Sequence, residues 1–322
     1  MKNVVIFIPC LNEMDGIKSL VDDLIIFCKQ SQKFVYKILV VDDGSTDGLN
    51  KMYTKLGIDY FYRNKLNLGL GAATRIGMEC AHYIGGDIFI KFDADLQHRI
   101  SDIEKIALKI DEFDLDIVYG SRFAGKINYK MPIYRKLGNY FFTKLMKVLT
   151  AWKITDAQTG LMCFSRNYLT VFEMPSTYNP PQQALMDGKS KKMLYGEIAV
   201  EFDKRKHGKS FISIKYIYKV FSALLKLIFV YHSYRILVGS GLILIIVSAV
   251  DFFLKIRYGT GIMSDFYISF VNRNLIFAII SVNFFITGLQ TFAILNRNII
   301  NRNNGNYIYM NRESLIKVSK ID

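Results

Sequence analysis

Short apolar runs and amphipathic stretches alternate along the first two thirds of the chain. Runs rich in β-branched and aromatic residues are typical of strands that are buried on both faces of a sheet. Such runs cover residues 4–8, 36–41, 60–62, 88–92, 116–119, 161–164 and 195–202. Between them, apolar residues recur at helical spacing over residues 17–28, 73–80, 103–113 and 134–150. This alternation predicts an α/β fold with a mostly parallel, doubly wound sheet.

The last third of the chain has a different pattern. Residues 214–234 alternate Ile and Leu with lysines and aromatic residues, which predicts an amphipathic helix in the membrane interface; an ordinary surface helix is the alternative. Residues 236–254 and 275–295 are apolar runs of about 20 residues, the length that crosses a bilayer, and two buried core helices are the alternative.

These patterns predict four parts of the chain. We expect a cytoplasmic domain over residues 1–212, a juxtamembrane amphipathic helix over 213–235 and a two-helix transmembrane hairpin over 236–295. Residues 296–322 are expected to form a loosely ordered cytoplasmic tail.

The chain is strongly basic, with 42 Lys and Arg against 28 Asp and Glu, a formal net charge of +14. Such a charge suits an anionic bilayer, an anionic substrate or nucleic acid. No nucleic-acid-binding motif stands out, so we expect no nucleic-acid partner. Basic residues are dense before the first apolar run and recur after the second, which places both termini and the domain on the cytoplasmic side. We therefore expect an integral protein of a cytoplasmic membrane, in contact with membrane lipids.

The candidate chemistry begins where the apolar run 88–92 ends. Asp93, Asp95 and Gln97 follow at alternate positions, and alternate residues of an extended segment point to the same side. Their oxygens suit a hard cation such as Mg²⁺ or Mn²⁺. For so short a pattern, a solvated strand end is the alternative. Other polar clusters also follow predicted strands, so we expect one crevice at the carboxyl edge of the sheet.

Four segments in order resemble the motifs of family-2 inverting glycosyltransferases, which have a GT-A fold. The chain is similar in particular to the polyprenyl-phosphate glycosyltransferases, a group that includes dolichol-phosphate mannose synthase. The segments are Ile8-Pro9-Cys10-Leu11-Asn12-Glu13, Val41-Asp42-Asp43-Gly44-Ser45-Thr46-Asp47, Asn67-Leu68-Gly69-Leu70-Gly71 and Asp93-Ala94-Asp95-Leu96-Gln97.

The resemblance implies roles for the donor side of the crevice. Asp95 with Gln97 would hold the metal against the diphosphate, and Asp93 would face the ribose or the metal. Asp43 would accept hydrogen bonds from the base or ribose, and an Asx-type turn is a compatible alternative. The nucleotide-sugar donor would be bound by Pro9, Asn12, Glu13, Asp43, Gly71 and Asp93.

The acceptor side separates the polyprenyl-phosphate group from its relatives. A lipid monophosphate is already ionised near neutral pH and needs no general base, whereas a hydroxyl does. The Gln-x-x-Arg-Trp motif typical of polysaccharide-forming members is missing from the sequence. The resemblance implies an acceptor-phosphate site made of Arg122, Arg135, Asn139, Arg205 and Lys209. It implies a catalytic set of Asp95, Arg122 and Arg135. Arg205 and Lys209 could instead bind anionic lipid head groups.

We therefore expect transfer of a sugar from a nucleotide-sugar to an undecaprenyl-type phosphate at the cytoplasmic membrane face, with inversion. One alternative is transfer to a hydroxyl of a sugar or lipid. Another, opposed by the intact carboxylates, is a non-catalytic membrane scaffold. The segment 176–192 departs from the family pattern and leaves the donor sugar open. Asn283 and Gln290 could serve helix pairing in a homo-oligomer or packing within one chain.

Overall fold

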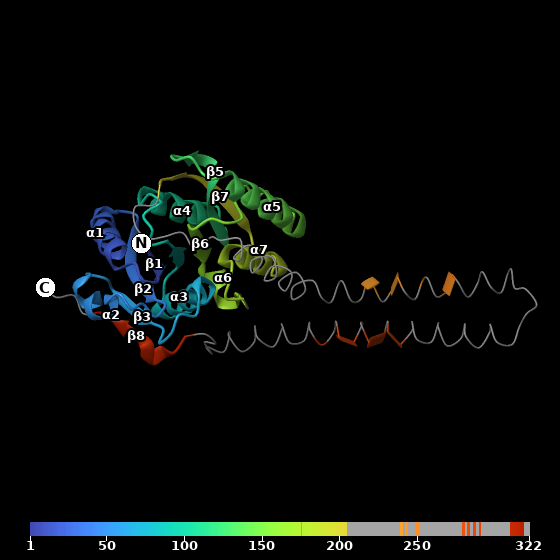
Figure 1. Cartoon of the computed structure of the whole chain (residues 1–322), viewed down its shortest axis with the longest axis horizontal. Helices are drawn as coiled ribbons and strands as arrows, with labels where there is room; N and C mark the ends of the chain where they lie inside the picture. The colour runs from blue at the N-terminus through green and yellow to red at the C-terminus, as the bar shows by residue number, and fades with distance from the viewer. Residues whose placement is uncertain are drawn as a thin grey trace, which may run out of the picture. The chain divides into compact units, whose positions relative to one another are not determined.

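The computed structural model describes residues 1–174, 176–204 and 310–318, together with scattered helical positions between 239 and 290. The chain divides into two compact units. The first unit holds the described residues up to 204 and from 310 onwards (Figure 1).

The first unit is built on one eight-stranded sheet of order β7-β5-β6-β4-β1-β2-β3-β8. The pairs β1–β2, β1–β4, β2–β3 and β5–β7 are parallel, while β6 and β8 pair antiparallel with their neighbours. The prediction of an α/β fold with a mostly parallel sheet is therefore confirmed. The strands are β1 Lys2–Cys10, β2 Phe34–Asp42, β3 Tyr60–Arg63, β4 Ile88–Lys91, β5 Ile117–Ile127, β6 Met162–Ser165, β7 Tyr195–Phe202 and β8 Leu315–Lys317.

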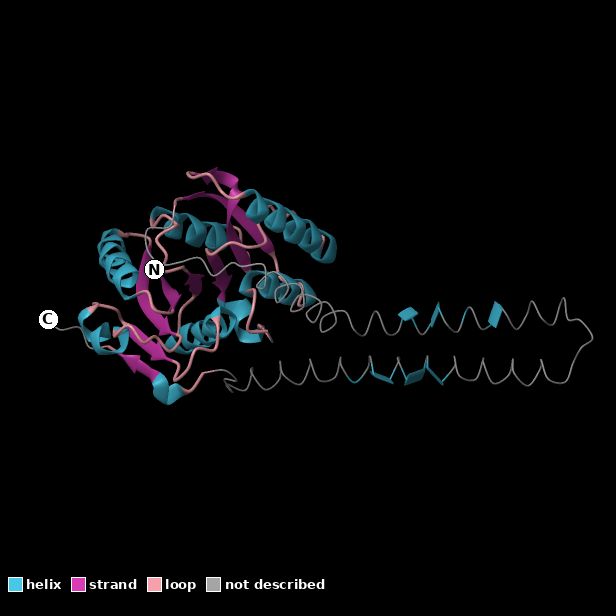
Figure 2. Ribbon diagram, viewed as in Figure 1, coloured by secondary structure: helices cyan, strands magenta, loops and turns pink. Residues whose placement is uncertain are grey.

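Helices lie on both sides of the sheet (Figure 2). The four long helices lie close to the predicted positions, while the short α2 and α6 and the helix α7 were not predicted. The helices are α1 Met14–Gln30, α2 Leu49–Met52, α3 Leu70–Ile84, α4 Ser101–Glu112, α5 Ile133–Thr150, α6 Arg166–Val171 and α7 Pro180–Ser190, with 3-10 turns η1 Tyr53–Lys55 and η2 Arg312–Ser314.

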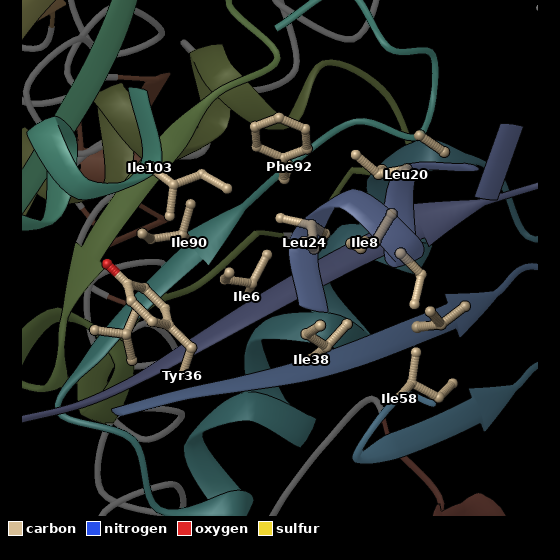
Figure 3. Packing of buried hydrophobic residues seen from close by; sticks show 14 of the residues in the cluster. Ile6, Ile8, Leu20, Leu24, Tyr36, Ile38, Ile58, Ile90, Phe92 and Ile103 are labelled. Atoms are coloured by element: carbon tan, nitrogen blue, oxygen red, sulfur yellow. The ribbon is translucent and has the colours of Figure 1, made fainter. Parts of the chain in front are cut away.

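The core explains why β1 reads as an uninterrupted apolar run. Ile6 and Ile8 face a cluster that includes Leu24 of α1 and Ile103 of α4 (Figure 3). The intervening residue Phe7 points to the other side, where it touches α3 so closely that a Cβ at Gly77 would overlap its ring. Fully burying each large apolar side chain contributes about 1.5–3 kcal/mol, which accounts for an apolar side chain at every position from Val4 to Ile8.

One expectation about the tail is wrong. Residues 310–318 are an ordered part of the first unit, and β8 pairs antiparallel with β3 through Phe61 and Ile316. The Met310 N–H donates to a carboxylate oxygen of the buried Glu79 on α3, at 2.8 Å. The tail is held because it covers an edge strand whose N–H and C=O groups would otherwise be unpaired.

The expected membrane segments lie almost wholly outside the described residues. Residues 214–234, Arg205 and Lys209 are also outside them. Within the described part of the chain, no helix has the length and hydropathy needed to cross a bilayer. The positions that are described in the second unit, such as Leu242 and Asn283, are helical, and the Asn283 side chain donates to the Ile279 carbonyl of its own helix at 3.0 Å.

Candidate active site

The ends of β1 and β2 form the first wall of the site. Cys10 and Asp42 are paired in register, and Asn12 follows in the left-handed region with φ of 53°. The Asn12 side-chain oxygen accepts from the Thr46 N–H at 2.8 Å, and the Asn12 N–H donates to the Ser45 hydroxyl at 2.9 Å. Asn12 therefore links the predicted motif at residues 8–13 to the one at residues 41–47, and its side chain stabilises the loop at Thr46.

Asp43 organises the neighbouring loop. Its carboxylate accepts from the Asn64 side chain at 2.7 Å, the Leu68 N–H at 3.0 Å and the Gly69 N–H at 2.8 Å. Burial raises the pKa of Asp43 above its usual value, although these hydrogen bonds oppose the shift. A carboxylate has about four acceptor positions, so one remains for a nucleotide. The sequence indicated Asp43 but missed Asn64.

Gly71, in the first turn of α3, is in direct contact with a distant loop. Its N–H donates to the Thr177 carbonyl at 3.0 Å, and a Cβ at Gly71 would overlap the Thr177 backbone. The side chain of Gln183 fixes this loop by bonding to Ser176 and Tyr178. The segment that departs from the family pattern thus lies against the glycine loop predicted to bind the donor.

The two carboxylates follow β4, but their geometry differs from the expected extended one. β4 ends at Lys91, and the chain then turns, with Leu96 at a φ of 58°. Asp95 and Gln97 are each 8% exposed. The Gln97 N–H donates to Asp95 at 3.2 Å, and its side-chain N–H donates to the Asp203 carbonyl at 2.9 Å. That second bond leaves the amide oxygen of Gln97 as the available ligand atom.

These oxygen donors fit a hard divalent cation. Within the described residues, no group of three or more His, Cys, Asp and Glu side chains could hold a metal ion. Mg²⁺ is commonly held by one or two carboxylates together with substrate phosphates, so Asp95 and Gln97 suit a cation that binds with a diphosphate.

Two of the five predicted acceptor residues, Arg122 and Asn139, converge on a carboxylate that the sequence did not indicate. Arg122 lies inside β5, with its Nε 2.6 Å from Asp156 Oδ2 and its Nη2 2.9 Å from Asp156 Oδ1. Asn139 of α5 donates to the same carboxylate at 2.8 Å. Burial alone would raise the pKa of Asp156, but Arg122 and Asn139 hold it below its usual value. In the sequence, Asp156 was indicated only by its position shortly before the strand predicted at residues 161–164, which is β6 in the structure.

Asp93, predicted on the donor side, and Arg122, predicted on the acceptor side, both act on His98. Burial lowers the pKa of His98 to about 4, and the charges of Asp93 and Arg122 act on the same ring. Burial lowers the pKa of Arg122, but Asp156 and, to a smaller extent, Asp93 raise it above its usual value. Arg122 and Asp93 are therefore electrostatic neighbours.

The other predicted residues are dispersed around this centre. Pro9 is buried near the end of β1, Glu13 precedes α1, and Arg135 lies half-buried in the first turn of α5. Arg205 and Lys209 fall outside the described residues, so their roles stay predictions.

The sequence profile described as "Glycosyl transferase family 2" matches residues 5–172, more than half of the chain. The chain belongs to glycosyl transferase family 2. It is a glycosyltransferase, and the predicted family is confirmed.

Two relatives of this family-2 enzyme are named as dolichyl-phosphate glycosyltransferases. The chain is 30% identical over 220 residues to a UDP-N-acetylglucosamine–dolichyl-phosphate N-acetylglucosaminyltransferase of Methanococcus voltae, covering 62% of this chain and 85% of the relative. It is 31% identical over 177 residues to a dolichyl-phosphate β-glucosyltransferase of Dictyostelium discoideum, covering 50% and 53%.

A solved structure supports the fold of the family-2 domain. Glucosyl-3-phosphoglycerate synthase from Mycobacterium tuberculosis superposes with a TM-score of 0.53, covering 70% of this chain and 80% of that chain at 17% identity. That protein was crystallised with Mn²⁺ and uridine diphosphate.

Proposed function

We propose that this enzyme transfers a sugar from a nucleotide-sugar to the phosphate of a polyprenyl phosphate, with inversion, at the cytoplasmic face of a membrane. The acceptor phosphate oxygen would attack the anomeric carbon on the face opposite the departing nucleoside diphosphate. The names of the relatives and the motif resemblance favour this acceptor class.

The single observation that carries the proposal is the fixed orientation of Arg122. Its guanidinium donates two hydrogen bonds to the Asp156 carboxylate and a third to the Gln158 carbonyl. An arginine in this position can draw an anionic phosphate toward an anionic donor without removing a proton from it. An acceptor that is already ionised needs that attraction more than it needs a general base.

On the donor side, Asn12, Glu13, Asp43 and Gly71 would bind the nucleotide at the ends of β1 and β2 and the start of α3. Asp95 and Gln97 would hold Mg²⁺ or Mn²⁺. Such a cation, when bound, offsets negative charge on the leaving nucleoside diphosphate.

The outer face of α5 supports attachment to a membrane. Leu137, Tyr140 and Val148 are 64%, 67% and 74% exposed on this helix. Between Ser121 and Thr155 the chain carries eight Lys or Arg side chains and no Asp or Glu. An exposed apolar face flanked by cations matches the chemistry of an anionic lipid surface.

The second unit supports the same location. Its described apolar side chains include Leu242, Ile243 and Ile246, which are 55%, 63% and 60% exposed. Side chains of this kind on a helix are favourable in lipid, and we propose that residues 236–254 and 275–295 cross the bilayer.

The test is a transfer assay with the purified full-length enzyme in phospholipid nanodiscs. Mn²⁺, polyprenyl phosphate and a panel of nucleotide-sugars are supplied, and products are identified by mass spectrometry. We expect a glycosyl phosphate lipid with one donor, with its anomeric configuration opposite to that of the donor. The methyl ester of the lipid phosphate and the free polyprenol should be inert. No product with any donor would contradict the proposal, and transfer to free polyprenol would favour a hydroxyl acceptor.

A further inference from the structure

Lys91 is a buried cation in the central strand β4. Its side chain is 2% exposed, and its neighbours Ile90 and Phe92 are fully buried core residues. Removing an ammonium group from water is unfavourable unless a partner of opposite charge replaces the lost solvation. An apolar residue would suit this strand position better, so the partner of Lys91 explains its presence.

The partner of Lys91 is Asp93. Lys91 and Asp93 form an ion pair, and the Lys91 ammonium also donates to the Gly160 carbonyl at 3.1 Å. The other carboxylate oxygen of Asp93 packs against Gly160, where a Cβ would overlap it. Asp93 is thus held between a cation inside the strand and the loop before β6.

We propose that Lys91 is a positioning residue that neutralises Asp93 and keeps it out of the metal's coordination sphere. The inference rests on the proposed function and deepens it. Asp93 then accepts a hydrogen bond from a hydroxyl of the nucleotide-sugar, and Asp95 is the carboxylate that binds the cation. A divalent cation at Asp93 would have to approach the Lys91 ammonium and compete with it for the same carboxylate.

This pairing would make tight binding of the metal depend on prior binding of the donor. With Asp93 already paired, the free enzyme offers few anionic ligands to a cation, so binding is weak until a donor diphosphate supplies further oxygens. Lys91 would thereby couple metal binding to the presence of the donor.

The test is a Mn²⁺ titration of the full-length enzyme without nucleotide, in which free Mn²⁺ is measured by electron paramagnetic resonance. Lys91→Met removes the charge and keeps a long apolar stem, and we expect it to tighten Mn²⁺ binding about tenfold because Asp93 becomes a second ligand. Lys91→Arg keeps the charge and should bind Mn²⁺ as the wild type does. Asp95→Asn should weaken binding strongly.

Asp93→Asn keeps the proposal testable even if Lys91→Met does not fold. In the wild-type background, Asp93→Asn should change Mn²⁺ affinity less than twofold, because Asp93 is not a ligand there. In the Lys91→Met background it should remove the tenfold gain. A strong loss of Mn²⁺ affinity in the single Asp93→Asn variant would overturn the inference, and so would a folded Lys91→Met enzyme with unchanged affinity. Because these titrations need no sugar transfer, their failure is distinct from a failure of the glycolipid assay.

Discussion

Arg122 and Asp156 form a two-point ion pair between β5 and the loop before β6, with distances of 2.6 and 2.9 Å. The arginine side chain is 13% exposed and the carboxylate fully buried. An arginine bound in this way keeps one orientation in the absence of substrate. The pair therefore stabilises the domain and also holds the Arg122 guanidinium in a fixed position in the site.

We expect Asp156→Asn to destabilise the domain by about 3–5 kcal/mol, because it leaves a buried guanidinium without its counter-charge. It should also raise the KM for the lipid phosphate more than the KM for the donor, because Arg122 loses its orientation. Trp152, the one tryptophan of the chain, stacks on Tyr195 and reports unfolding by fluorescence. Asp87→Asn, which removes the more exposed ion pair with Arg166, is the control and should cost less than about 1 kcal/mol. Equal losses in the two variants would contradict the assigned role.

The free energy of unfolding should fall in acid, partly because Asp156 becomes protonated. Its pKa is lower in the folded chain than in the unfolded one, where it is about 3.9. The unfolded state therefore binds the proton more readily, so this contribution is fully present above that unfolded pKa and is lost as the pH falls through the folded pKa. The difference in unfolding free energy between wild type and Asp156→Asn should shrink below about pH 4. A constant difference from pH 7 to pH 3 would argue against it.

Gly71→Ala should weaken nucleotide binding. The added methyl group would overlap the backbone of Thr177 and displace the loop that faces the start of α3. We expect at least a tenfold rise in the dissociation constant of the nucleoside diphosphate, a loss of about 1.4 kcal/mol, measured by calorimetry. Gly138→Ala is the matched control, because a Cβ at that position meets nothing within 4 Å and alanine favours a helix. The proposed contact would be unsupported if both variants bound nucleotide equally.

The outer face of α5 should bind anionic vesicles. Leu137→Asp and Val148→Asp each remove exposed apolar area and add a charge that an anionic surface repels. Because burying a large apolar side chain contributes about 1.5–3 kcal/mol, each change should weaken the contact of α5 with lipid at least tenfold. The measurement is the quenching of Trp152, which follows the end of α5, by brominated lipids in anionic vesicles that hold the full-length enzyme. Ile26→Asp on α1, which is 56% exposed, should have no effect. A similar loss in all three variants would mean a nonspecific charge effect.

Deleting residues 310–322 should destabilise the first unit. The deletion uncovers the edge of β3 and removes the Met310 N–H from the buried Glu79. Losing a hydrogen bond to a charged group costs about 1.5–3 kcal/mol, which corresponds to a fall of several degrees in melting temperature. The point variant Ile316→Thr, at a side chain 40% exposed, should melt close to the wild type. An unchanged melting temperature after the deletion would show that β8 contributes nothing to stability.

Much of the fold could be predicted from local patterns. The strand at residues 4–8 and the helix through Leu20 and Leu24 follow from hydrophobic periodicity, which each segment carries by itself. The glycine loop before Gly71 and the pair Asp93 and Asp95 stood out because their polar residues follow apolar runs. The short strand β8 did not, because three residues are too few to show a period.

The sequence by itself determined the order of the first seven strands and of the four long helices, the family and the candidate donor residues. Only the tertiary structure decided that Asp43 is bonded to Asn64, that Arg122 and Asn139 share Asp156, and that Lys91 neutralises Asp93. The partners of Asp43 and of Asp156 lie on separate elements, which only the folded chain brings together. The pairing of Lys91 with Asp93 depends on the turn of the chain after β4. Hydrophobic periodicity predicts which face of an element is buried, but not which charged side chains of other elements lie against that face.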